Sequence, residues 1–245
     1  MKQKLLIFIA AGLAVGVLGF FLLQQGGQTA VPPPAPAARA QVAPPPDLAA
    51  LKTKASSGDP AAQTSLGWIY QKGTGVKPDV KAAVNWFRQA AEQHYPEALT
   101  ALGEMTQAGQ GTKLDLAEAA RLYRLAAEQG NVAGQYDLAY LYEQGSGVGK
   151  NETEAAKWYE LAAAGGDPIA QYDIGQRYWL GVGVSTNRTQ ACKWLTLAAG
   201  QGQTDSTRLL RDLKPHMSAA ELAQANQLLK EFVPRAPIVL HSKMN

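Results

Sequence analysis

The chain has very few of the residues that build disulfides, metal sites and nucleic-acid-binding surfaces. Its only cysteine is Cys192, which excludes a disulfide within the chain and a metal cluster held by several cysteines. Three histidines, His94, His216 and His241, are too widely separated to show the spacing of metal ligands. The formal net charge of +3 is small, and no concentrated basic block is present. We therefore expect no metal, no cofactor and no nucleic-acid partner.

Catalytic motifs are also missing from the sequence. It contains no catalytic serine–histidine–aspartate set, zinc-protease motif, P-loop or dinucleotide fingerprint. Four Gly-x-Gly segments, such as residues 145–147, lack the lysine and the serine or threonine of a phosphate-binding loop. Their recurrence indicates that they end helices instead. We predict that the chain is not an enzyme.

Charged residues are absent from the apolar run at residues 5–23. About 20 apolar residues span a bilayer, whereas the apolar core of a cleaved signal peptide is about 7–15 residues long. Lys2 and Lys4 precede the run, and the first charge after it is Arg39. This asymmetry predicts that residues 5–23 are a transmembrane anchor, with residues 1–4 in the cytoplasm and the rest outside. The alternative is a cleaved signal peptide, which would make the chain a secreted effector.

Residues 24–50 are rich in proline and alanine. Such a composition cannot bury a core and favours the extended polyproline II conformation. We predict a linker that holds the rest of the chain away from the membrane. A recognition motif within the proline runs is the alternative interpretation.

Beyond the linker, the sequence repeats every 36 residues without an insertion. Glycine loops recur at residues 73–75, 109–111, 145–147 and 181–183. Alanine pairs recur at residues 90–91, 126–127, 162–163 and 198–199. A period of this size is typical of a stack of small structural units.

Each repeat divides into two predicted helices. The first helix begins near Pro60, Pro96, Val132 and Pro168 and ends at the glycine loop, where glycine adopts a positive φ without strain. Residues that cap helices well precede the second helix; they are Asp79, Asp115, Asn151 and Asn187. Three of them are followed three residues later by Glu118, Glu154 and Gln190, which predicts capping boxes. Capping explains Asn151 and Asn187 better than glycosylation does.

The predicted fold class is therefore all-α, an α-solenoid of stacked helix-turn-helix repeats with one N-terminal transmembrane helix. Four repeats occupy residues 51–202, and capping helices occupy residues 203–233. Within the latter, residues 204–213 and 219–232 have helical patterns, and the second begins with a capping box at Ser218 and Glu221. Residues 234–245 are predicted to be a tail.

The repeats resemble the Sel-one-like repeat (SLR), a relative of the tetratricopeptide repeat. The motif residues of the first copy are Ala62, Leu66, Gly67, Tyr70, Gly73, Gly75, Val76, Ala83, Trp86, Ala90 and Ala91. The second copy departs from this motif at Thr106, Thr112 and Leu122, and the third departs at Gly134 and Ala139. These changes leave the register intact, and the resemblance covers residues 57–202.

The tetratricopeptide relatives bind peptides in a concave groove lined by the first helices. This resemblance implies a partner-binding groove at Thr64, Trp68, Gln71, Glu104, Tyr136, Tyr140, Glu143, Tyr172, Gln176 and Trp179. Lys72, Thr100, Gln107 and Gln144 occupy neighbouring groove positions. Rigid aromatic rings anchor a partner at low entropic cost. Alternatively, some of these rings pack between adjacent first helices.

The resemblance and the topology together imply a scaffold or adaptor anchored in a bacterial inner membrane. Its repeats would face the periplasm and bind a protein or peptide, in cell-envelope assembly or signalling. The alternative from another class is a regulator or binder of peptidoglycan or of a wall enzyme. The sequence identifies neither the partner nor the oligomeric state.

Overall fold

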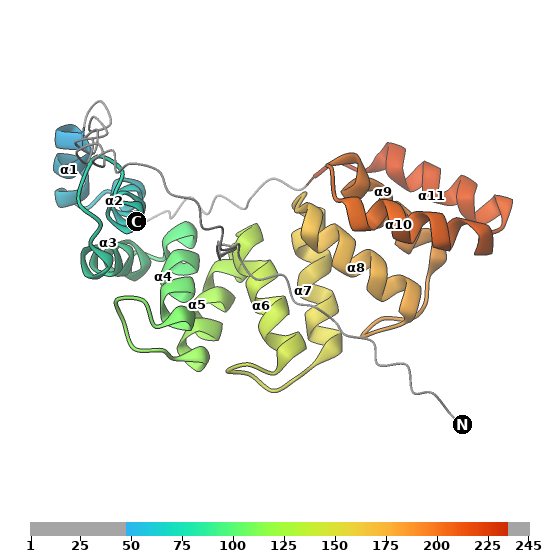
Figure 1. Ribbon diagram of the computed structural model, residues 1–245, viewed down its shortest axis with the longest axis horizontal. Coiled ribbons are helices and arrows are strands. Elements are labelled where there is room, and N and C mark those ends of the chain that lie inside the picture. Colours follow the sequence, from blue (N-terminus) through green and yellow to red (C-terminus); the bar gives the residue numbers. More distant parts are fainter. Residues whose placement is uncertain (1–47, 235–245) are drawn as a thin grey trace, which may run out of the picture. The chain divides into compact units, whose positions relative to one another are not determined.

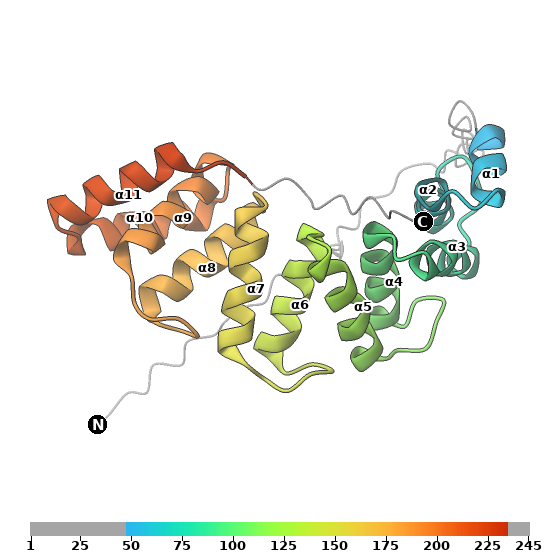
Figure 2. The same ribbon diagram turned by 180° about the vertical axis from the view of Figure 1, so that it is seen from behind.

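The computed structural model describes residues 48–234, which are helical and contain no strand. The elements are α1 (Leu48–Ser56), α2 (Pro60–Lys72), α3 (Val80–Glu92), α4 (Pro96–Ala108), α5 (Leu116–Glu128), α6 (Val132–Gln144), α7 (Glu152–Ala164), α8 (Pro168–Leu180), α9 (Arg188–Gly200), α10 (Thr204–Leu213), a 3-10 helix η1 (Lys214–His216) and α11 (Ala219–Glu231). From α1 to α10, successive helices pack against one another in chain order, whereas α11 packs against α9 (Figures 1 and 2). The predicted all-helical solenoid is confirmed.

The predicted transmembrane anchor, residues 5–23, lies outside the described residues, as do residues 235–245 of the predicted tail. From Leu48 to Pro234, no helix is both long and apolar enough to cross a membrane.

Both helices of every repeat are 13 residues long. The carboxylates of Asp59 and Asp167 accept hydrogen bonds from backbone N–H groups at the starts of α2 and α8, and Asn131 does the same for α6. Each first helix ends at a glycine in the left-handed conformation; these glycines are Gly73, Gly109, Gly145 and Gly181. The predicted starts and ends of the first helices are confirmed.

The second helices are capped by the predicted residues, but the three predicted capping boxes are wrong. The side chains of Asp115, Asn151 and Asn187 accept from the helix as expected. A capping box also requires the backbone N–H of the cap residue to be free for the Glu or Gln side chain. That N–H already donates to the preceding first helix, as from Asp115 to the Thr106 carbonyl (3.1 Å). Glu118 instead forms an ion pair with Arg121 (2.7 Å).

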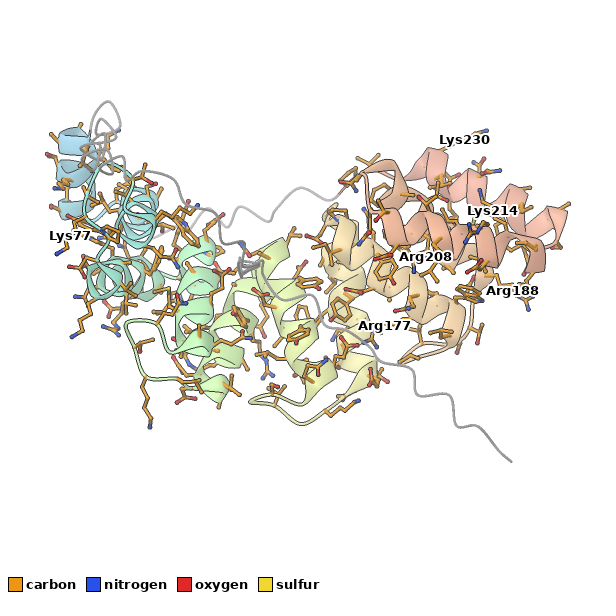
Figure 3. The ribbon with its side chains drawn as sticks, in the orientation of Figure 1. Lys77, Arg177, Arg188, Arg208, Lys214 and Lys230 are labelled. Carbon is orange, nitrogen blue, oxygen red and sulfur yellow. The ribbon has the colours of Figure 1, made fainter. Side chains whose placement is uncertain are left out.

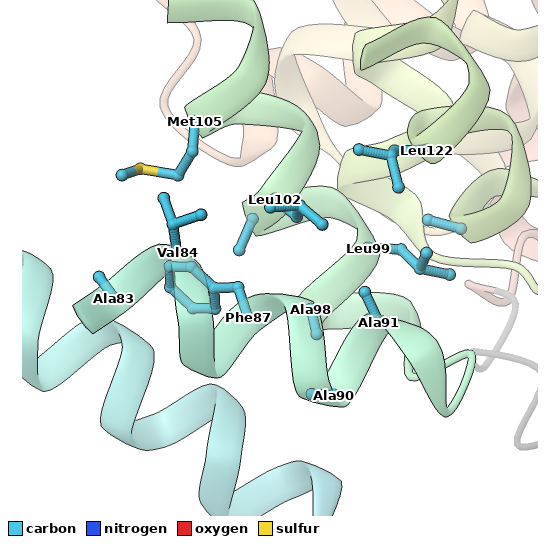
Figure 4. Packing of buried hydrophobic residues seen from close by; sticks show 12 residues of the cluster. Ala83, Val84, Phe87, Ala90, Ala91, Ala98, Leu99, Leu102, Met105 and Leu122 are labelled. Atoms are coloured by element: carbon cyan, nitrogen blue, oxygen red, sulfur yellow. The ribbon is translucent and has the colours of Figure 1, made fainter. Parts of the chain in front are cut away.

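Small residues allow the two helices of a repeat to approach closely. A Cβ atom on Gly67 would overlap the ring of Phe87, and one on Gly103 would lie 2.6 Å from the Tyr123 ring. Figure 4 shows Val84 of α3 pointing toward Met105 of α4, and Phe87 belongs to the same buried cluster. The aromatic side chain of the second helix therefore fills the space that the glycine leaves.

Both ends of the repeat array are covered by additional helices. Helix α1 begins at Leu48, inside the segment predicted as linker (residues 24–50). Its Ala55 lies 36 residues before Ala91 and is buried, so α1 takes the place of the second helix of an incomplete repeat. At the other end, α10 and α11 follow the last repeat, and the capping box predicted at Ser218 and Glu221 is present.

A buried glutamine, which the sequence reasoning missed, joins neighbouring repeats. The amides of Gln63, Gln135 and Gln171 donate to carbonyl oxygens of Ala55, Ala127 and Ala163 at 3.1, 3.1 and 3.2 Å. Each accepting carbonyl is near the end of the preceding second helix, on α1, α5 or α7. The second repeat has Leu99 at this position and makes the junction with apolar contacts instead.

We expect Gly147→Ala to destabilise the repeats. Gly147 has a φ of +71°, and an added Cβ would overlap the carbonyl oxygen of Leu116 in the preceding repeat. The left-handed conformation alone costs a non-glycine residue roughly 1–3 kcal/mol. The matched control is Gly149→Ala, because nothing lies within 4 Å of a Cβ at that position. Chemical denaturation should show a loss for Gly147→Ala and a change of at most about 0.5 kcal/mol for the control; equal losses would contradict the packing argument.

Candidate functional site

The predicted partner-binding residues lie on α2, α4, α6 and α8, and we call the surface that these helices form the first-helix face. Side-chain contacts join neighbouring first helices across it. The Gln71 amide of α2 is 3.1 Å from the sulfur of Met105 on α4, and Arg177 of α8 pairs with Glu143 of α6. Between α4 and α6, the Thr100 hydroxyl donates to the side chain of Asn131, the cap residue of α6 (3.0 Å). The first helices therefore form one continuous surface in the described part of the chain.

At the α2 end of this face, most side chains already have partners. Thr64 is buried, and its hydroxyl donates to the Pro60 carbonyl (2.7 Å). The half-buried ring of Trp68 packs edge-on against Phe87, with centroids 5.0 Å apart, and Lys72 lies 5.5 Å from the Trp68 ring. Thr64 thus presents little surface to a partner, and Trp68 also belongs to the core.

A buried arginine of α8, which the sequence reasoning missed, bonds side chains of the third repeat. Arg177 is 5% exposed, and its guanidinium bonds Glu143 at 2.6 Å and Glu152 at 2.8 Å. Glu143 also accepts from the Tyr159 hydroxyl (2.7 Å), and the Tyr159 ring is 5.1 Å from Arg177. Glu143 therefore satisfies two buried groups, the Arg177 guanidinium and the Tyr159 hydroxyl, which limits its capacity to bond a partner. Figure 3 shows Arg177 on α8.

Tyr136 continues this network. Its ring packs edge-on against Tyr159, with centroids 5.4 Å apart, and burial, followed by the charge of Asp173, raises the pKa of its hydroxyl. Burial raises the pKa of the Asp173 carboxyl to about 7, with a further upward contribution from Glu143 that Arg177 opposes. The Glu152 carboxyl has a lowered pKa because Arg177 and then Lys150 donate to it.

Asp137, on the same helix as Tyr136, forms no hydrogen bond or ion pair within residues 48–234. Burial raises the pKa of its carboxyl to about 7, and the negative charges of Glu104 and Asp167 raise it further. Burial also raises the pKa of Glu104, although this side chain is in contact with solvent. The middle of the first-helix face is thus acidic and only partly neutralised.

Tyr140 is the most exposed aromatic side chain among the predicted residues, at 41%. The half-buried Gln176 occupies the equivalent position in the next repeat. By contrast, Tyr172 and Trp179 pack against the cluster around Leu195, Leu210 and Leu213. The structure therefore favours the packing interpretation for Tyr172 and Trp179, whereas the Tyr140 ring is open to solvent.

The sequence did contain a signal for the missed acidic positions. The tripeptide Gln-Tyr-Asp occurs at residues 135–137 and again at 171–173, one period apart. Its glutamine makes the junction between repeats, and its aspartate lies on the first-helix face. No group of three or more His, Cys, Asp or Glu side chains in residues 48–234 could hold a metal ion.

We expect Asp137→Asn to stabilise the protein at pH 8. Because the folded-state pKa of about 7 lies above the ordinary 3.8, folding favours the protonated form, and stability rises as the pH falls through about 7. The amide removes the charge, so the variant should have a higher Tm than the parent at pH 8 and a smaller advantage at pH 5.5. Asp212→Asn, on an exposed side chain of α10, is the control. A pH-independent difference, or the same behaviour in the control, would contradict the assignment.

Comparisons with known proteins agree with this geometry. The chain is similar to the crystal structure of a protective antigen of uropathogenic Escherichia coli that displays an SLR fold, with 35% identity and a TM-score of 0.66 over 72% of this chain and 38% of the antigen. It therefore spans well under half the length of that antigen. It is also similar to a Sel1 repeat protein from Oxalobacter formigenes, with 35% identity and a TM-score of 0.62 over 67% of this chain and 68% of that one. No curated protein sequence matches it.

The repeats themselves match one family description. The Sel1 repeat matches residues 60–95, 96–131, 132–167 and 168–203, which together are more than half of the chain. Each match begins at a first helix and ends after the second, so the boundaries coincide with the structural units. Proteins built from these repeats generally mediate protein–protein interactions and are generally non-catalytic scaffolds. The chain belongs to the Sel1 repeat family.

Proposed function

We propose that this protein is a membrane-tethered scaffold whose first-helix face binds an extended segment of another protein around Tyr140. The exposed ring of Tyr140 is the observation that carries this proposal. A tyrosine at the surface of a rigid helix contributes a large contact area while losing little entropy on binding. The family's general role in protein–protein interaction supports a protein as the ligand.

The charges around Tyr140 indicate which segments fit. The charge of Glu104 adds to the effect of burial in raising the pKa of the Asp137 carboxyl, and neither side chain forms an ion pair with a described residue. A lysine or arginine of the partner would relieve this repulsion while an apolar neighbour covered the tyrosine ring. The bound segment would therefore combine a basic residue with an apolar one.

The tether is the second part of the proposal. Residues 5–23 have the length and composition of a membrane-spanning helix, and the positive residues precede them. In this arrangement the repeats would face the periplasm of a bacterial cell, where they would assemble other proteins of the envelope.

Photo-crosslinking tests the binding surface. A photoreactive phenylalanine analogue at position 140 should capture a discrete partner in cells, which mass spectrometry then identifies. The same analogue at Leu114, an exposed apolar side chain that precedes α5, is the matched control and should capture nothing specific. Tyr140→Ala should reduce recovery of that partner at least roughly tenfold, since a hot-spot residue contributes about 2 kcal/mol or more. Its Tm should remain unchanged. Equal capture at both positions would refute the proposal.

The mass of the mature protein tests the tether. We expect the chain purified from cell membranes to retain residues 5–23, and a variant lacking these residues to leave the membrane fraction. An amino terminus near residue 30 would instead show cleavage and overturn the anchor, without affecting the proposal for the first-helix face.

A further inference from the structure

A second candidate binding surface lies between α7, α9 and the end of α11. These elements surround a cavity of about 520 Å³, a size typical of sites that hold small ligands or protruding side chains. Apolar side chains line part of it, including Leu161, Leu228 and Phe232. None of its lining residues belongs to α2, α4, α6 or α8. This cavity is therefore separate from the first-helix face.

Lys193 of α9 is the charged group at this cavity that lacks a polar partner. Its ammonium lies 3.8 Å from the ring centroid of Trp194 and 5.2 Å from that of Phe232, and it makes no ion pair with any residue from 48 to 234. The nearby Glu160 accepts from the Tyr178 hydroxyl (2.9 Å), and Glu231 accepts from the Gln227 amide (2.5 Å). Burial lowers the pKa of Lys193, although the charge of Glu160 opposes this effect.

The earlier repeats show why this lysine lacks an ion pair. At the same register, Arg121 pairs with Glu118 three residues before it at 2.7 Å, and Lys157 lies 3.8 Å from Glu154. In the fourth repeat the acidic residue is replaced by Gln190, which carries no charge. The basic residue is retained but its counterion on the same helix is missing.

The neighbouring indole is a second group without a partner. Trp194 is 3% exposed, and its Nε1–H finds no acceptor among the described residues. A buried donor without an acceptor is unfavourable, because it has lost its water without gaining a hydrogen bond. Two adjacent residues, one cationic and one a buried donor, therefore border a partly apolar cavity. Its two carboxylates, Glu160 and Glu231, accept hydrogen bonds from other residues.

We propose that this cavity binds an acidic peptide segment of another protein, which inserts an apolar side chain and places a carboxylate beside Lys193. The carboxylate replaces the counterion that Gln190 does not provide. The inserted side chain packs against Phe232 and Leu228 and removes their surface from water. Because this surface is separate from the first-helix face, the scaffold can bind two partners at once.

Fluorine NMR on the full chain tests this proposal. The protein contains five tryptophans, so 5-fluorotryptophan labelling gives few signals, and Trp194→Phe identifies that of Trp194. The probes are an acetylated, amidated hexapeptide, Ala-Leu-Leu-Asp-Leu-Ala, and its twin with asparagine in place of aspartate. We expect the acidic probe to shift the Trp194 signal and to bind about tenfold more tightly, since charge-assisted hydrogen bonds are roughly twice as strong as neutral ones.

Variants at Lys193 and at the equivalent residue Arg121 distinguish an effect of charge from an effect of packing. Lys193→Gln should abolish the preference for the acidic probe, Lys193→Arg should keep it, and Arg121→Gln on α5 should leave it unchanged. Equal binding of the two probes to the parent protein, or no shift of the Trp194 signal, would overturn the proposal. Binding to a chain that ends at Pro234 but not to the full chain would also overturn it, because residues 235–245 would then be the natural occupant.

Discussion

One backbone hydrogen bond, repeated four times, sets the geometry of every helix pair. The N–H of the cap residue of each second helix donates to a carbonyl nine residues earlier, in the last turn of the first helix. These bonds join Asp79 to Tyr70, Asp115 to Thr106, Asn151 to Tyr142 and Asn187 to Tyr178, at 2.8–3.1 Å. Carbonyls at the end of a helix have no partner within it, so the bond satisfies a group that would otherwise require water. It fixes the loop and therefore the angle at which the helices meet.

Because this backbone hydrogen bond holds each helix pair in place, the side chains packed between the two helices can differ from one repeat to the next. Phe87, Tyr123, Tyr159 and Leu195 occupy the same position in successive second helices and differ in size and polarity. The two tyrosines need acceptors for their hydroxyl groups, which Gln107 and Glu143 supply. The side chain at a position of the first-helix face can thus be required by a buried tyrosine that needs an acceptor. Glu143 is such a residue, whereas Tyr140 accepts from no buried tyrosine among the described residues.

Much of the fold could be predicted from the sequence, because the features that define it recur at a constant interval. The glycine loops, the cap residues and the buried alanines each occur four times, so a single substitution such as Leu122 does not obscure the pattern. The roles of the side chains on the candidate site were harder to predict. An arginine is found at this position of the repeat only in the fourth copy, as Arg177. Its partners Glu143 and Glu152 come close to it only in the folded chain.

The errors have a physical cause as well. The predicted capping boxes assumed that the cap N–H groups were free, and a contact within the repeat uses them. Helix α1 follows a proline-rich segment and shows only part of the motif, so its position could not be read from composition. The packing of Trp179 depends on α10, which lies beyond the last repeat and does not follow the period.

The close approach of the second loop glycine to the preceding repeat also bears on how such a chain can change during evolution. Gly147 lies against the backbone at Leu116, and Gly183 lies in the same way against Glu152. An insertion or a side chain in this loop would separate two neighbouring units, and every later unit would lose its register with the earlier ones. Gene changes that add or remove a complete unit of 36 residues leave all these contacts in place. The array is therefore free to vary in the number of its units but not in their length.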